Sequence, residues 1–276
     1  MDLPRPVFDE LRRLIQGLCG VTLSEDKAYL IRHRLEPVVR DCGLSGFEEL
    51  ARRLREPGGA ALQDVVVEAI TTGETAFFRD GHPFETFRRH VLPDLLARRR
   101  RVRLWCAGAA TGQEAYSFAV IVAEFIEASG GRGVGEGTFS ILATDVSARA
   151  LAIARAGEYT RQETARGLSA AQLARHFERR GERWAVREPV RRLVEFHRAN
   201  LVQPFSALGT FDAIFCRNVL IYFDDDTRRR VVAQMRAALA DGGWLLLGSA
   251  ETLYGIVDGF ESVRLGDTLL YRRRPA

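Results

Sequence analysis

The stretch FDAIFCRNVLIYFD, residues 211–224, contains a strand, a polar corner and the approach to a helix. Large apolar side chains dominate residues 211–215, as in a short buried strand. Cys216, Arg217 and Asn218 follow, where a parallel strand would lead into a loop. Because ligands of open α/β sheets bind at the carboxyl ends of strands, we expect this corner to form one wall of a site. The alternative is a buried strand end at which Arg217 and Asn218 tie down neighbouring loops.

Downstream of this corner, a second apolar run at residues 219–223 carries one phenol, Tyr222. It ends at three consecutive acids, residues 224–226, directly before apolar residues at helical spacing. Negative charge is favourable at the N-terminus of a helix. The sequence therefore predicts a helix that begins at these acids.

Upstream, an apolar run at residues 102–105 leads into a glycine-rich turn at 107–114 and then into a helical pattern. This order of strand, turn and helix lets a nucleotide-like ligand approach the backbone closely. Gly108 and Gly112 are spaced G-x-x-x-G, however, and not as the G-x-G-x-x-G of dinucleotide-binding folds.

A further predicted strand follows the glycine-rich connector at 130–137 and ends at Asp145. An acid at the tip of the second strand is well placed to accept hydrogen bonds from ribose hydroxyls. This favours an adenosine-containing ligand. Alternatively, Asp145 caps the helix that starts near Ser147.

The alternation of strands and helices predicts an α/β fold with a parallel sheet. Residues from about 159 to 198 interrupt it, and we expect a small antiparallel unit there with a turn near Glu188 and Pro189. Residues 260–272 predict a closing hairpin that turns at Gly266.

The first seventy residues predict four helices and show no chemistry of their own, so docking or covering is the expected role. The second helix is expected from about Glu25, capped by Ser24 and kinked at Pro37, with Tyr29 among its apolar positions. Val65 is one of the apolar positions of the fourth.

A polar loop at residues 71–80, TTGETAFFRD, connects these helices to the α/β part. Phe77 and Phe78 are expected to anchor it in a core, which would hold Arg79 in place. A guanidinium in that position is suited to orient a carboxylate. The alternative is an interdomain linker with a structural ion pair.

The overall composition is that of a globular protein, with 276 residues, 46% apolar and 28% charged. The net charge of +4 does not indicate nucleic-acid binding, since the 40 basic residues are interspersed with 36 acids and no aromatic-interleaved basic stripe occurs. The four cysteines form no CxxC pair, so neither a zinc site nor a disulfide framework is indicated. With no apolar run of transmembrane length and no signal-peptide pattern, we expect a cytoplasmic protein without membrane insertion.

Several long motifs in a fixed order resemble the CheR family of chemotaxis receptor methyltransferases, across essentially the whole chain. They are TTGETAFFRD (71–80), CAGAATGQEAYS (106–117), ATDVSARALAIARAGEY (143–159), HRANL (197–201), FDAIFCRNVLIYFD (211–224) and GGWLLLGSAETL (242–253).

The resemblance implies an N-terminal helical domain (1–72) and a Rossmann-like methyltransferase domain (73–276) with an inserted antiparallel β-subdomain (about 160–198). It implies S-adenosylmethionine as cofactor and S-adenosylhomocysteine as product. The implied reaction is methyl-ester formation on glutamates of chemoreceptor cytoplasmic helices, by a protein expected to be a monomer.

The resemblance also implies the site residues. Arg79 and Tyr222 would border the methyl-transfer site. The cofactor-binding residues would be Gly73, Thr75, Arg79, Ala107, Gly108, Glu114, Asp145, Asn200, Leu201, Cys216, Arg217 and Asn218.

The chain departs from the family pattern in four places. Gly73 stands where the family has asparagine, and Gln113 replaces one acid of a glutamate pair. Glu36 and Pro37 interrupt the basic face of the second helix. The inserted subdomain is short, with its glycine turn at 180–183, so we expect no tight binding of a receptor tail peptide. The alternatives are a non-catalytic cofactor-binding module and a methyltransferase for another protein or a small acid.

Overall fold

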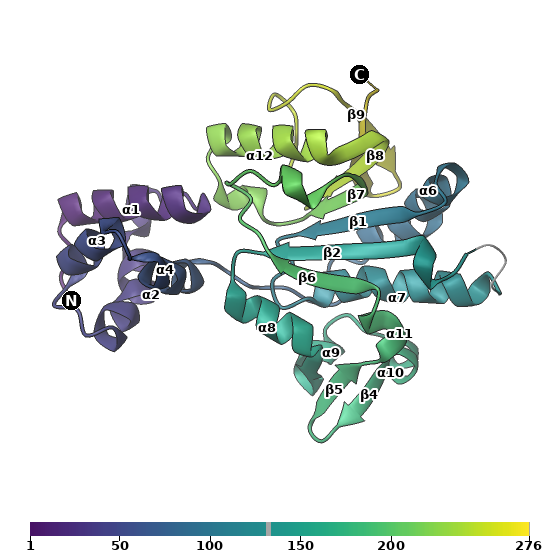
Figure 1. Cartoon of the computed structure of the whole chain (residues 1–276), viewed down its shortest axis with the longest axis horizontal. Helices are drawn as coiled ribbons and strands as arrows, with labels where there is room; N and C mark the ends of the chain where they lie inside the picture. The colour runs from purple at the N-terminus through teal and green to yellow at the C-terminus, as the bar shows by residue number, and fades with distance from the viewer. Residues whose placement is uncertain (131–133, 276) are drawn as a thin grey trace.

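The computed structural model describes residues 1–130 and 134–275. A bundle of helices at the N-terminus is joined by an extended segment to a larger body that contains a central sheet (Figure 1). This arrangement confirms the predicted fold class. The glycine-rich connector predicted at 130–137 includes residues 131–133, which lie outside the described residues.

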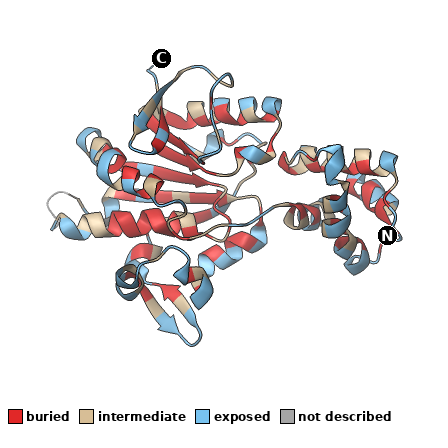
Figure 2. Cartoon of the chain, turned by 180° about the vertical axis from the view of Figure 1, so that it is seen from behind, coloured by how far each residue is buried: buried red, intermediate tan, exposed pale blue. Residues whose placement is uncertain are grey.

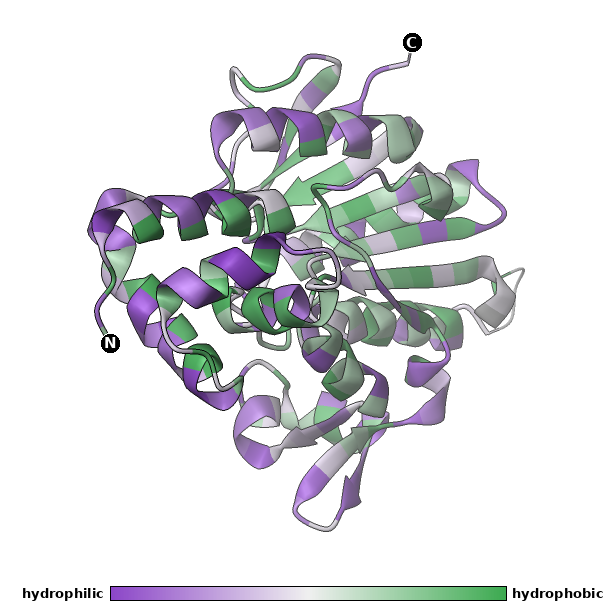
Figure 3. Cartoon of the chain, turned by 60° about the vertical axis from the view of Figure 1, so that its left-hand side comes forward, coloured by the Kyte–Doolittle hydropathy of each residue, from purple (hydrophilic) through white to green (hydrophobic). Residues whose placement is uncertain are grey.

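Four α-helices and one 3-10 turn make up the N-terminal bundle. They are α1 (Arg5–Cys19), η1 (Glu25–Lys27), α2 (Ala28–Asp41), α3 (Phe47–Arg55) and α4 (Ala60–Ile70). Each α-helix carries hydrophobic and hydrophilic residues, as expected of helices that bury one face (Figure 3). Leu11, Leu35 and Phe47 are completely buried between them.

Details of α2 and α4 differ from the prediction. The α-helix starts at Ala28 after a 3-10 turn, and Ser24 makes no side-chain capping bond. Tyr29 and Val65, expected to face the core, are 64% and 41% exposed. The rotation of α2 turns Ile31 and Leu35 inward, which leaves Tyr29 on the solvent side.

The central sheet has seven strands in the order β6-β2-β1-β7-β8-β10-β9. Their bounds are β1 (Val102–Ala107), β2 (Phe139–Asp145), β6 (Val194–Arg198), β7 (Phe211–Cys216), β8 (Leu239–Leu247), β9 (Phe260–Leu265) and β10 (Thr268–Arg273). The first five strands of that order are parallel, and β10 is antiparallel to both neighbours. Strand order reverses between β1 and β7, which is where open α/β sheets bind ligands.

Helices cover both faces of the sheet, and the strands between them are mostly buried (Figure 2). One face packs against α5 (His82–Thr86), the π-helical turn η2 (Phe87–Val91), α7 (Gln113–Ala128) and α8 (Ala148–Ala156). The other face packs against α12 (Asp225–Ala238), whose N-terminus is capped by Asp224 as its acidic approach predicts. In the first layer, the rings of Phe118 and Phe215 stack 3.8 Å apart. The short α6 (Leu92–Arg98) leads into β1.

The inserted subdomain is a three-stranded antiparallel sheet in the order β3-β5-β4. It comprises β3 (Glu158–Thr160), α9 (Arg161–Ala165), α10 (Ala170–His176), β4 (Phe177–Arg180) and β5 (Arg183–Val186).

The turn predicted near Glu188 and Pro189 is wrong, because these residues start the short helix α11 (Glu188–Arg191). A proline lacks the N–H that the first turn of a helix leaves unused, so Pro189 fits this position. The hairpin turns at Gly181 and Glu182, within the glycine turn that the sequence places at 180–183. Residues 194–198, assigned to the insert by the sequence, pair with β2 in the main sheet.

Two glycines near the end of α1 should respond to alanine in opposite ways. Gly17 lies within α1, and an added Cβ would have nothing within 4 Å. Because glycine destabilises a helix relative to alanine, Gly17→Ala should raise the free energy of unfolding by about 0.5–1 kcal/mol. Gly20 has a φ of 78°, and its Cβ would lie 2.5 Å from Val202 Cγ1 and 2.9 Å from Phe223 Cε1. Gly20→Ala should destabilise by at least roughly 1 kcal/mol through left-handed strain and loss of domain docking. Calorimetric melting of both variants checks this, and shifts in the same direction would contradict it.

Candidate active site

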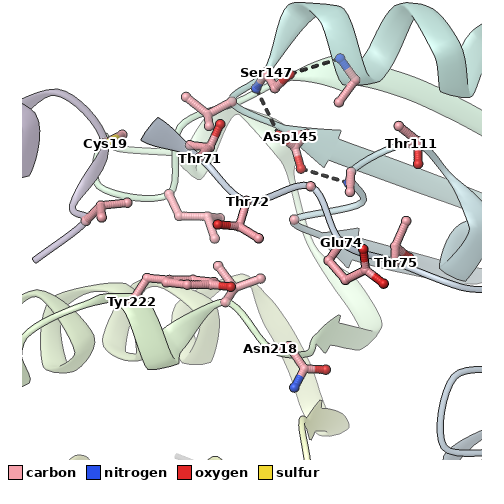
Figure 4. A pocket seen from close by; sticks show the side chains of 18 of the residues that line it. Cys19, Thr71, Thr72, Glu74, Thr75, Thr111, Asp145, Ser147, Asn218 and Tyr222 are labelled. Atoms are coloured by element: carbon pink, nitrogen blue, oxygen red, sulfur yellow. Dashed lines mark hydrogen bonds between the residues drawn. The ribbon is translucent and has the colours of Figure 1, made fainter. Parts of the chain in front are cut away.

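A cavity of about 340 Å³ lies at the carboxyl ends of the parallel strands, with one side formed by the N-terminal bundle. Most of the predicted site residues line it. They are Gly73, Thr75, Arg79, Gly108, Glu114, Asp145, Asn200, Leu201, Arg217, Asn218 and Tyr222. Figure 4 shows that side chains from the 71–75 loop, the end of β2 and the segment after β7 surround one space.

Two predicted cofactor-binding residues, Ala107 and Cys216, do not line the cavity. They are the last residues of β1 and β7 and are only 1% and 0% exposed. Their side chains belong to the core cluster beneath α12. Each is followed by a residue that does line the cavity, Gly108 after Ala107 and Arg217 after Cys216.

The carboxylate of Asp145 organises the glycine-rich loop. One oxygen accepts the Ala110 N–H at 2.8 Å and the other accepts the Ser147 N–H at 2.9 Å (Figure 4). The Ser147 hydroxyl, in turn, caps α8 by accepting the Ala150 N–H. Asp145 therefore does not cap α8 itself. It binds the N–H of Ser147, and the hydroxyl of Ser147 is the cap.

Burial raises the pKa of Asp145 above the ordinary 3.8, although the N–H groups of Ser147 and Ala110 oppose the shift. Burial also raises the pKa of Glu114, and the neighbouring Arg217 opposes that shift. The cavity thus contains two carboxyls that protonate more readily than solvent-exposed ones.

Arg217 connects the corner after β7 to two other segments. Its side chain is 1% exposed and donates to Glu114 at 2.7 Å, to Asp80 at 2.6 Å and to the carbonyl of Arg79 at 3.0 Å. The guanidinium lies 5.4 Å from the ring centre of Phe84. Arg217 therefore lines the cavity and also holds neighbouring loops in place. The two alternatives for the polar corner, a wall of the site and a buried strand end that fixes loops, both apply to it.

The N-terminal bundle contributes residues that the sequence did not predict as part of the site. Cys19 and Val21, at the end of α1, line the cavity. Glu68 accepts the Ser147 hydroxyl at 2.6 Å and the Arg149 N–H at 3.0 Å. No local pattern could have revealed Glu68, since its two contacts join residues about eighty positions apart.

Asn200 and Tyr222 are held by the same bundle. The Asn200 amide donates to the carbonyl of Leu18 at 2.6 Å, and its oxygen accepts the Val202 N–H at 3.2 Å. The carbonyl of Tyr222 accepts the Thr22 N–H at 2.8 Å. In Figure 4 the Tyr222 ring lies beside Thr72, across the cavity from Asp145.

Arg34 of α2 fixes the loop that begins at residue 71. It donates to the carbonyl of Thr71 at 3.3 Å and the hydroxyl of Thr72 at 3.0 Å, and it also bonds the carbonyl of Ile70. Arg34 thus points inward, while Arg32 and Arg40 of the same helix are exposed.

Within residues 1–130 and 134–275, no group of three or more His, Cys, Asp and Glu side chains is arranged to hold a metal ion. All four cysteines are unbridged. None of the helices in the described part of the chain has the length and apolarity needed to cross a bilayer.

Comparison with known proteins identifies both parts of the chain. Residues 6–71 match the all-alpha domain of CheR methyltransferases, and residues 73–268 match their SAM-binding domain. The chain is 37% identical to chemotaxis protein methyltransferase 1 of Pseudomonas aeruginosa, covering 97% of each chain. It is 41% identical to chemotaxis protein methyltransferase 1 of Vibrio cholerae, covering 96% of each. The protein therefore belongs to the CheR family of chemotaxis methyltransferases, which use S-adenosylmethionine.

Proposed function

We propose that this protein transfers a methyl group from S-adenosylmethionine to glutamate side chains on the cytoplasmic helices of chemoreceptors, forming γ-glutamyl methyl esters. The observation that carries the proposal is the convergence of Asp145, Glu114, Arg79 and Tyr222 on one cavity in a chain of this family. The choice of a chemoreceptor glutamate as the methyl acceptor rests on the family resemblance.

The cavity has the chemistry to hold an adenosyl ligand. Each Asp145 oxygen accepts one backbone N–H and retains a lone pair that ribose hydroxyls would use. Gly108, with a φ of 81°, leaves its backbone open to a ligand, and no side chain would fit there because a Cβ would lie 2.4 Å from Val219 Cγ2. The acids Glu114 and Asp145 suit a ligand that carries positive charge. S-adenosylmethionine, when bound, supplies an activated methyl group.

This reaction needs no general base from the protein. A glutamate side chain has an ordinary pKa of about 4.3, so the acceptor is already ionised at neutral pH. The protein has to align the acceptor with the methyl group and exclude water from it. Arg79 is suited to this task, since its guanidinium lines the cavity and makes one long bond, 3.3 Å, to the carbonyl of Glu74.

A methyl-transfer assay tests the proposal. The whole protein is incubated with labelled S-adenosylmethionine and purified receptor cytoplasmic fragments, and mass spectrometry locates the modification. Base-labile label that is released as methanol, on glutamate, is the expected result. Stable label on nitrogen, or no transfer to receptor while a small acid is methylated, would contradict it.

Removal of the two groups at the proposed transfer site should reduce turnover. Arg79→Ala and Tyr222→Phe should each lower kcat/KM for receptor methylation by at least about tenfold, because each removes a polar group that orients the acceptor or the methionine part of the cofactor. Arg89→Ala is the matched control, since Arg89 is exposed and pairs with Glu85. Unchanged rates in the two site variants at saturating cofactor would remove them from this role.

Cofactor affinity should fall on acidification at a higher pH than an ordinary carboxyl would give. Burial raises the pKa of Asp145 and of Glu114. The ionised carboxylate accepts the ribose hydroxyls. The cofactor affinity is therefore at its full value above the raised pKa and decreases as the pH falls through it. Titration calorimetry with S-adenosylhomocysteine across pH measures this. Asp145→Asn should bind at least about tenfold more weakly at pH 7 and retain only the part of the pH dependence that Glu114 causes.

A further inference from the structure

Glu251, in the loop after β8, accepts four backbone hydrogen bonds from two loops. One carboxylate oxygen accepts the N–H groups of Gly248 at 2.7 Å and Asn218 at 2.8 Å. The other accepts those of Val219 at 3.0 Å and Ile221 at 3.2 Å. Three of these donors belong to the polar corner and second apolar run that follow β7.

The charge of Glu251 is balanced by these N–H dipoles. Among the residues that the structure describes, no salt bridge to Glu251 is formed. A ring of backbone N–H groups converging on one anion is a recognised way of holding negative charge. In this protein the anion is a side chain, so the ring and its two loops are fixed by a single residue.

The segment that Glu251 holds is part of the cavity wall. Asn218 and Val219 line the cavity, and Asn218 has a left-handed φ of 58°, which a non-glycine residue rarely adopts without support. The Val219 side chain lies close to the backbone of the glycine-rich loop, since a Cβ on Gly108 would lie 2.4 Å from Val219 Cγ2. Val219 is therefore packed between the two loops that follow β1 and β7.

Gly248 provides the space for this arrangement. A Cβ at residue 248 would lie 2.7 Å from the Glu251 carboxylate and 2.9 Å from the Asn218 nitrogen. Its φ is outside the left-handed region, so alanine would be excluded by these contacts and not by backbone strain.

We propose that Glu251 is a positioning residue for cofactor binding: its carboxylate holds Asn218 and Val219 in the conformation that shapes the adenosyl cavity. This inference deepens the assignment of the cavity to S-adenosylmethionine and rests on it. A purely structural Glu251 would instead affect stability without a specific effect on the ligand.

The test compares three variants of the whole protein. Glu251→Gln retains the shape of the side chain but replaces one oxygen by an NH₂ group, which faces two N–H donors and cannot accept from them. Gly248→Ala disturbs the same contacts while Glu251 is retained. Glu49→Gln is the control, because Glu49 accepts the N–H and hydroxyl of Ser45 at 2.7 and 2.8 Å and is not among the residues that line the cavity.

The primary measurement is the Kd for S-adenosylhomocysteine by calorimetry, well below the melting temperature of each variant. We expect Glu251→Gln and Gly248→Ala to bind at least tenfold more weakly than the wild type, and Glu49→Gln to keep the wild-type Kd. In the receptor assay, KM for S-adenosylmethionine should rise by the same factor while kcat at saturating cofactor stays within threefold.

Two results would overturn the proposal: a Kd within threefold of wild type in a folded Glu251→Gln or Gly248→Ala protein, or an equal loss of affinity in Glu49→Gln. Because binding is measured without an acceptor, the outcome is separable from the proposed reaction. Weakened binding in the two variants, with no receptor methylation by the wild type, would leave the role of Glu251 intact and reject only the glutamate acceptor.

Discussion

The guanidinium of Arg217 is almost fully buried and joins segments that are distant in the sequence. It binds Glu114 at the start of α7, and Asp80 together with the Arg79 carbonyl in the loop that enters the α/β domain. Removing one partner of a buried ion pair costs about 3–5 kcal/mol, because the other charge stays buried without compensation. Together with the pairing of β7 with β1 and the stacking of Phe118 on Phe215, this group fixes the relative position of β7, α7 and the 71–80 loop. The cavity exists because these three segments are held at the same end of the sheet.

The fold and the part of the site on strand ends could be predicted from the sequence. Apolar runs followed by polar residues mark the ends of β1, β2 and β7, and the carboxyl ends of neighbouring parallel strands lie at one edge of a sheet. Asp145 was predicted in this way and lines the cavity. Cofactor binding by Ala107 and Cys216, which the family resemblance implies, stays a prediction: their side chains lie in the core, and a run of residues around a strand end does not reveal which side chains reach the cavity.

What the sequence could not supply was long-range packing. The contacts of Glu68 with Ser147 and of Asn200 with Leu18 depend on how the helical bundle and the α/β domain meet, which no periodicity in the sequence indicates. The sequence counts Tyr29 among the apolar positions of the second helix, yet the buried Ile31 and Leu35 fix the rotation of α2 and leave Tyr29 exposed. The sequence marks Glu251 only as part of the motif at 242–253. A glutamate that binds four backbone N–H groups cannot be distinguished in the sequence from a glutamate exposed to solvent.

The wall that α1 and its following turn contribute has a thermodynamic consequence. Cys19 and Val21 border the same cavity as Asp145 and Asn218, so a molecule in that cavity contacts both domains at once. Ligand that binds only the closed arrangement stabilises it by RT ln(1 + [L]/Kd), and separating the domains would then require giving up that energy. Any separation of the helical bundle from the α/β domain would remove contacts with a molecule bound in this cavity, so ligand binding and such a separation would be linked equilibria.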